Sequence, residues 1–110
     1  GFSTWTRGLA WAILGFAEIL EILPHLSDSV FQAMGGRAEV TAALENAAKA
    51  TADFYLENTP ACGVPYWDTG APNLHKLRDY LAHPADPFNS FEPVDSSAAA
   101  ITAQGLLRLS

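Results

Sequence analysis

Apolar residues fall at helical spacing in the first part of the chain, along residues 7–23. Steps of three and four residues separate the members of one stripe, which are Leu9, Ile13, Phe16, Leu20 and Leu23. This period predicts an α-helix. Thr4 or Thr6 would supply the side-chain cap at its start, and Pro24 would end it. Because most other positions are also apolar, we expect an interior helix.

Residues 37–57 show a second helical pattern with a polar side. Every fourth residue on that side is charged, in the order Glu45, Lys49, Asp53 and Glu57. The opposite, apolar face is expected to contain Val40, Ala43, Ala47, Ala50 and Phe54. Glu45 and Lys49 stand in the favourable i,i+4 order. The pattern predicts an outer helix with one solvated face, which begins after Gly35-Gly36.

A third helix is expected at the end of the chain, over residues 95–110. Asp95, Ser96 and Ser97 suit its N-cap and first turn, and the positions that follow are mostly apolar. Residues 58–94 hold six of the seven prolines, so we expect mainly loop there, with a short helix over 74–82. Another short helix is expected over 27–34. The order inner, outer, inner predicts an all-α fold built from helical hairpins.

Composition excludes some functions and leaves others open. The net charge of −6 argues against binding to a nucleic-acid backbone. No run of about 18 residues is free of charge, so we expect no membrane span. The single Cys62 excludes an internal disulfide. The sequence shows no leader, and it begins and stops inside strong helical patterns. We therefore expect a fragment of a larger domain, and localisation stays open.

Arg7 and Trp11 form the first candidate site. They are four residues apart at the start of an interior helix and share one face. A guanidinium there favours a carboxylate ligand, and an indole beside it offers a flat wall to a sugar ring. The structural alternative is a core tryptophan next to an arginine that is paired with a carboxylate of the protein.

Trp67 and Asp68 lie in the long loop. Asp68 has three possible roles: pairing with Arg7, binding a ligand hydroxyl, or closing an Asx-turn with Gly70. Asp95 is more typical of a helix cap than of a catalytic acid. The three histidines show no metal-ligand spacing, so no metal site is expected.

Three motifs in order resemble glycoside hydrolase family 88, the unsaturated glucuronyl hydrolases. They are WTRGLAW at 5–11, GVPYWDTGAP at 63–72 and DSSAAAI at 95–101. The resemblance is to the C-terminal part of these enzymes, and the sister family of unsaturated rhamnogalacturonyl hydrolases shares their fold. One position departs from the pattern, since Leu9 stands where the family usually has Gln.

The resemblance implies an (α/α)6 barrel, of which residues 1–110 would form a part. It also implies the substrate, an oligosaccharide that carries a 4,5-unsaturated uronate at its non-reducing end. By the same resemblance the substrate-binding residues are Arg7, Trp11, Trp67, Asp68, Asp95 and Ser96. The catalytic aspartates of the family match nothing in this chain, so we expect no hydrolysis by it alone.

No cofactor is implied by the family chemistry, in which an aspartate protonates the substrate. The location is unknown from the sequence, and a bacterial cytoplasm or periplasm is expected. The alternative hypothesis is a non-enzymatic helical scaffold that shares the fold. The presence of two aspartates on inner helices elsewhere in the protein would distinguish an enzyme from such a scaffold.

Overall fold

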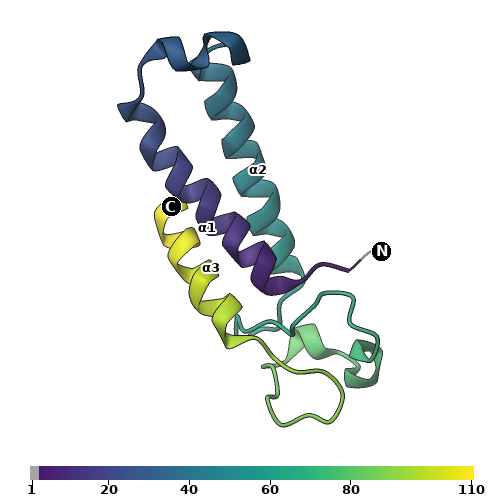
Figure 1. Ribbon diagram of the computed structural model, residues 1–110. Helices are drawn as coiled ribbons and strands as arrows, with labels where there is room; N and C mark the ends of the chain where they lie inside the picture. The colour runs from purple at the N-terminus through teal and green to yellow at the C-terminus, as the bar shows by residue number, and fades with distance from the viewer. Residues whose placement is uncertain (1–2) are drawn as a thin grey trace.

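The computed structural model describes residues 3–110 as three α-helices joined by turns and one long loop (Figure 1). The α-helices are α1 (Thr6–Ile22), α2 (Arg37–Glu57) and α3 (Ser96–Leu109). Short 3-10 turns are η1 (Leu23–His25), η2 (Asp28–Met34), η3 (Leu74–Leu77) and η4 (Tyr80–Ala82). Within residues 3–110 no strand forms, apart from two isolated bridges. The all-α class is confirmed, and it accords with a piece of an α/α barrel.

Helix α1 lies between the other two helices and packs against both of them. Its buried side chains belong to Thr6, Ala10, Ile13, Leu14 and Ala17. Of the predicted stripe, Ile13 belongs to this set and Leu23 is buried just beyond the helix. The other three members, Leu9, Phe16 and Leu20, are partly buried. The predicted threonine cap is wrong: Trp5 is the N-cap residue and makes no side-chain cap bond.

Helices α1 and α3 approach each other closely at Gly105. A Cβ atom at Gly105 would lie 2.9 Å from Ile13 Cγ2 and 3.1 Å from the backbone nitrogen of Leu14. Beside this contact, a buried cluster joins the two helices and consists of Ala10, Leu14, Ala98 and Ile101. Small residues at the crossing therefore allow the two helices to pack backbone against backbone.

Helix α2 runs back along α1 as the second arm of a hairpin (Figure 1). Its predicted bounds are confirmed. Its buried residues, however, are Ala48, Ala52 and Tyr55, whereas Ala43, Ala50 and Phe54 are exposed. The predicted face is wrong by about one residue, because alanines occupy several faces and do not mark one. The charged residues of the predicted polar side are all exposed.

The turn between α1 and α2 is held by Arg37, the first residue of α2. Its guanidinium bonds to Asp28 and to the carbonyl groups of Leu23 and Leu26, and it stacks over the Phe31 ring. The helix predicted at 27–34 is present, but as a 3-10 turn. This turn ends at Gly35, whose φ of 94° favours glycine.

The long loop has a small core of its own. Tyr66, Ala71 and Leu74 are buried together, and Tyr80 meets the Tyr66 ring edge-on, with ring centroids 5.8 Å apart. Instead of the single short helix expected over 74–82, two 3-10 turns form. The loop gathers at the end of the helices where α1 begins (Figure 1). It is therefore an ordered cap on that end of the helix layer.

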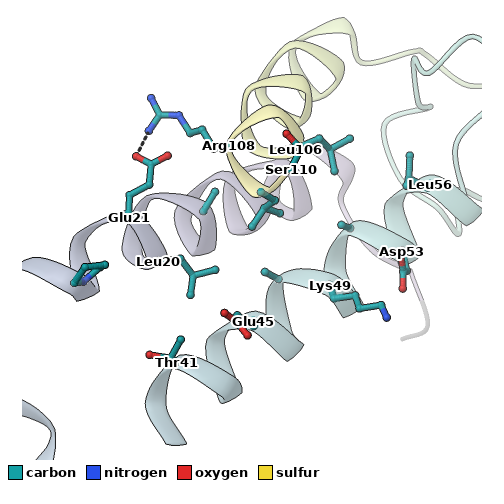
Figure 2. A pocket seen from close by; sticks show the side chains of 15 residues that line it. Leu20, Glu21, Thr41, Glu45, Lys49, Asp53, Leu56, Leu106, Arg108 and Ser110 are labelled. Atoms are coloured by element: carbon teal, nitrogen blue, oxygen red, sulfur yellow. Dashed lines mark hydrogen bonds and ion pairs between the residues drawn. The ribbon is translucent and has the colours of Figure 1, made fainter. Parts of the chain in front are cut away.

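Much apolar surface stays uncovered in this elongated molecule, which measures 54 × 27 × 18 Å. A groove of about 740 Å³ runs between the three helices. Figure 2 shows that residues of α1, α2 and α3 all line it, among them Leu20, Leu56 and Leu106.

The segment Thr6–His25 is long and apolar enough to cross a membrane. Core helices of soluble proteins can have the same length and composition, so this property does not show a membrane span. The expectation that the chain does not enter a membrane therefore remains a prediction.

Candidate functional site

The PYWD segment, residues 65–68, lies between the start of the chain and residues 93–95. On one side the Thr6 N–H donates to the Trp67 carbonyl at 3.0 Å. On the other side Trp67 N–H donates to the Pro93 carbonyl at 3.0 Å, and Asp95 N–H donates to the Pro65 carbonyl at 2.8 Å. Hydrogen bonds thus hold the N-terminal ends of α1 and α3 to one loop segment.

Thr6 strengthens this junction with its side chain. Its hydroxyl donates to the carbonyl groups of Tyr66 and Trp67, at 2.8 and 3.0 Å. The residue is 1% exposed, so these bonds are protected from water. Thr6 therefore joins α1 to the loop rather than capping the helix, and it fixes the position of its neighbour Arg7.

Arg7 forms an ion pair with Asp95. The Arg7 Nε donates to Asp95 Oδ2 at 3.0 Å, while Asp95 Oδ1 accepts the Ala98 N–H at 2.9 Å. The Asp95 side chain is 4% exposed, and that of Arg7 is 48% exposed. The predicted cap at Asp95 is confirmed. The arginine is anchored through Nε, and no bond to its two Nη atoms is found among residues 3–110.

Asp68 takes the third of its three possible roles. Its Oδ1 accepts the Gly70 N–H at 2.9 Å and closes an Asx-turn. Arg7 is paired with Asp95 instead, so the hypothesis of an Asp68–Arg7 pair is wrong. Asp68 is 7% exposed. Asp68 also lies opposite Trp5 in an isolated bridge, in which the Thr69 N–H donates to the Thr4 carbonyl at 3.0 Å beside the bond from Thr6 to Trp67.

Three tryptophans lie exposed around the start of α1. The exposed fractions are 54% for Trp5, 55% for Trp11 and 38% for Trp67. Trp5 was not among the predicted site residues. Its ring covers Gly8, where a Cβ atom would come within 2.8 Å of the ring, so glycine is needed there. The WTRG spacing was the signal for this contact, since it places the indole one turn before Gly8.

Glu92 is a buried carboxylate that the sequence did not single out. It is 6% exposed, and its Oε2 accepts the Trp67 Nε1–H at 2.6 Å. Its Oε1 accepts the Asn73 N–H at 3.1 Å. A glutamate between Phe91 and Pro93 in a loop gives no sequence signal for burial.

Ser96 is the first residue of α3 and is exposed next to Asp95. The structure thus brings Arg7, Trp67, Asp68, Asp95 and Ser96 to one end of the molecule. Trp11 lies one turn further along α1. None of these six residues lines the groove between the three helices or the smaller hollow beside Tyr55.

The two shifted pKa values belong to residues outside this group. Burial raises the pKa of Tyr55, whose hydroxyl donates to the Gly63 carbonyl at 3.2 Å. The N–H groups of Ala85 and Val64 lower the pKa of the Cys62 thiol. Both residues line a hollow of about 340 Å³ between the loop, α2 and α3. No cluster of three or more His, Cys, Asp or Glu side chains suited to a metal ion occurs in residues 3–110.

Two curated proteins match the chain along nearly its whole length. An unsaturated glucuronyl hydrolase of Formosa agariphila is 34% identical over 109 residues, and one of Bacillus sp. strain GL1 is 36% identical over 107 residues. Each alignment covers 97% of this chain and 20% of the relative. The chain thus spans about a fifth of the length of these relatives. No family model matches it, and no solved structure does. Along 97% of its length, therefore, the chain is homologous to these two unsaturated glucuronyl hydrolases, as its three motifs predict.

Proposed function

We propose that this chain is the substrate-binding segment of a hydrolase that removes a 4,5-unsaturated uronate from the non-reducing end of an oligosaccharide. The names of its relatives support the hydrolase class. Because the match covers only about a fifth of each relative, the proposal assigns the chain to a larger α/α barrel, as part of its C-terminal half. The proton donor for the reaction would come from outside residues 1–110, and the chain alone would be inactive.

The observation that carries this proposal is the way Arg7 is held. Asp95 binds Nε, on one edge of the guanidinium, and the arginine remains half exposed. The Nη edge is thereby left to face a ligand, and two N–H groups there match the two oxygens of a uronate carboxylate.

The exposed indoles complete the proposed site. Trp11 stands one turn beyond Arg7 on the same face of α1, and Trp67 is joined through its carbonyl to the residue before Arg7. Flat apolar faces next to a fixed cation suit a carboxylated sugar ring, whose carbon–hydrogen faces stack on aromatic rings. Asp68 and Asp95 would act in this site by holding the loop and Arg7, and Ser96 would offer a hydroxyl to the substrate.

The proposed reaction is hydration of the C4=C5 vinyl ether. A carboxylic acid donates a proton to C4, and water adds at C5 after losing a proton to the resulting carboxylate. The hemiketal formed at C5 then opens to a ketone and leaves a hemiacetal at C1, which collapses to an aldehyde and releases the rest of the oligosaccharide as an alcohol. Arg7 has no part in these proton transfers. It fixes the uronate so that C4 lies next to the acid, which is a contribution of position.

The test is the substitution Arg7→Ala in the complete protein, assayed by loss of the ultraviolet absorbance of the C4=C5 bond in an unsaturated uronyl disaccharide. Losing the charge-assisted bonds to the carboxylate costs about 1.5–3 kcal/mol, which is a rise in KM of roughly 10- to 150-fold. Arg7→Lys would recover little of this, since it lacks the planar fork.

Arg108→Ala is the matched control, because it removes a guanidinium near the other end of α3, where it pairs with Glu18 and Glu21. It is expected to leave KM unchanged. If Arg7→Ala and Arg108→Ala change KM by the same small factor, Arg7 does not bind the uronate. That result would favour the alternative hypothesis of a non-enzymatic helical scaffold. The substrate class is assigned by comparing the activity on two disaccharides. One carries unsaturated glucuronate, and the other carries unsaturated galacturonate linked to rhamnose.

A further inference from the structure

Glu92 is a buried anion without a cationic partner in the described part of the chain, residues 3–110. A buried charge is costly unless hydrogen bonds compensate it. Here both oxygens are occupied by neutral donors, the indole N–H of Trp67 and the backbone N–H of Asn73. Within residues 3–110 these two bonds are the ones found to the buried carboxylate.

The backbone of Glu92 is fixed as firmly as its side chain. Asn89 accepts the Glu92 N–H at 2.8 Å through Oδ1 and donates to the Glu92 carbonyl at 2.8 Å through Nδ2. The carboxylate therefore has little freedom to follow a moving indole. Instead, its bond to Nε1 fixes the rotation of the Trp67 ring.

Trp67 is tied at three points. Its N–H donates to the Pro93 carbonyl, its carbonyl accepts from Thr6, and its indole N–H donates to Glu92. The residue nevertheless stays 38% exposed. An exposed tryptophan ordinarily samples several rotamers, and a substrate that binds to it must fix one of them at an entropic cost. Because Glu92 already holds the polar edge of the Trp67 ring, this ring loses less conformational entropy when the substrate binds.

We propose that Glu92 is a positioning residue, which orients the Trp67 indole to receive the sugar next to Arg7. This inference rests on the proposed function, and it adds a role to a residue that the motifs do not contain. The carboxylate does not touch the substrate. It acts through one hydrogen bond, from the Trp67 indole N–H to Oε2, while Oε1 accepts the Asn73 N–H.

The hydrogen bond is tested first, without substrate. In the complete protein labelled with ¹⁵N at its tryptophan indoles, the Trp67 signal is the one that disappears in Trp67→Phe. We expect this N–H to exchange slowly with deuterium and to exchange at least about tenfold faster in Glu92→Gln, because one amide oxygen cannot serve both donors. An unchanged exchange rate in Glu92→Gln would overturn the proposal.

Kinetics then test the consequence for the substrate. Glu92→Gln is expected to raise KM for an unsaturated uronyl disaccharide about 3- to 10-fold, with kcat within about twofold of its original value. In the Trp67→Phe background, which lacks the indole N–H, Glu92→Gln should change KM less than about twofold. The matched control is Asp86→Asn, which changes a carboxylate of the same loop that accepts the Phe88 N–H.

A merely structural Glu92 would produce the same change of KM in both backgrounds, and that result would overturn the inference. The two proposals fail in different ways. If Arg7→Ala raises KM but Glu92→Gln does not, the substrate assignment stands and the role of Glu92 is refuted. If Arg7→Ala, Trp67→Phe and Glu92→Gln all leave KM unchanged, the proposed function itself is refuted, and the role of Glu92 with it.

Discussion

Replacing Asp95 separates the two tasks of its carboxylate. Oδ1 caps α3 through the Ala98 N–H, and Oδ2 holds the Arg7 Nε. Alanine removes both acceptors. Asparagine keeps one oxygen, which must choose between the two donors. We expect it to stay on Ala98, because that bond is buried, whereas the half-exposed Arg7 can turn to water.

The expected effects on stability follow from these contacts. Losing a side-chain cap costs about 1 kcal/mol of unfolding free energy. The ion pair adds only about 0.5–1 kcal/mol, because Arg7 is half exposed and solvent screens the pair. Asp95→Asn should therefore destabilise the protein by about 0.5–1 kcal/mol, and Asp95→Ala by about 1.5–2 kcal/mol.

The expected effect on substrate binding is different, because both variants release Arg7 to the same extent. Under the proposed function each should raise KM for an unsaturated uronyl disaccharide by a similar factor, about 3- to 10-fold, through the lost anchoring of the guanidinium. Thermal unfolding measures the first effect, and steady-state kinetics on the complete protein measure the second. A normal KM in Asp95→Asn with a raised KM in Asp95→Ala would refute the reasoning, since Asp95 would then act only through α3.

Two further predictions concern parts of the chain away from Arg7. Gly105→Ala should lower the melting temperature, because overpacking against Ile13 costs about 1–3 kcal/mol and outweighs the roughly 1 kcal/mol gained in helix propensity. In Gly15→Ala the new Cβ meets no atom within 4 Å, so this variant should raise the melting temperature. Equal changes of melting temperature in the same direction in both variants would contradict this account. Cys62 should be alkylated at lower pH than a free thiol, because nearby N–H groups lower its pKa and favour the thiolate. Mass spectrometry of the peptide that contains Cys62 measures the rate of alkylation at each pH. If this rate rises at the same pH as for a free thiol, or at a higher pH, the effect is disproved.

Local features of the fold could be predicted from the sequence. The bounds of α2, the end of α1 before Pro24 and the cap at Asp95 follow from short-range chemistry. Each depends on residues within one or two turns, where propensity and capping decide the structure. The face that α2 buries could not be predicted, because alanine adds little to any hydrophobic pattern and several faces look alike.

The site could be predicted only in part, because its contacts join distant residues. Arg7 and Asp95 are separated by 88 positions, and each was identified without its partner. The resemblance to a family indicated which residues gather, but not which atoms meet. Glu92 escaped both approaches, since it lies outside the motifs and since burial of a loop carboxylate depends on donors that come from elsewhere in the chain.

The junction at residues 65–68 explains why three motifs far apart in the sequence lie next to one another in the structure. The loop segment bonds on one side to Thr6 and on the other to Pro93 and Asp95, so its displacement would move the starts of both α1 and α3. Arg7 then bridges the two helices directly through Asp95. A ligand that binds the free edge of Arg7 would therefore contact a side chain already fixed by α1, α3 and the loop. In the proposed function this rigidity has a chemical use, because an acid from another part of the barrel can protonate C4 only if the uronate is held in one position.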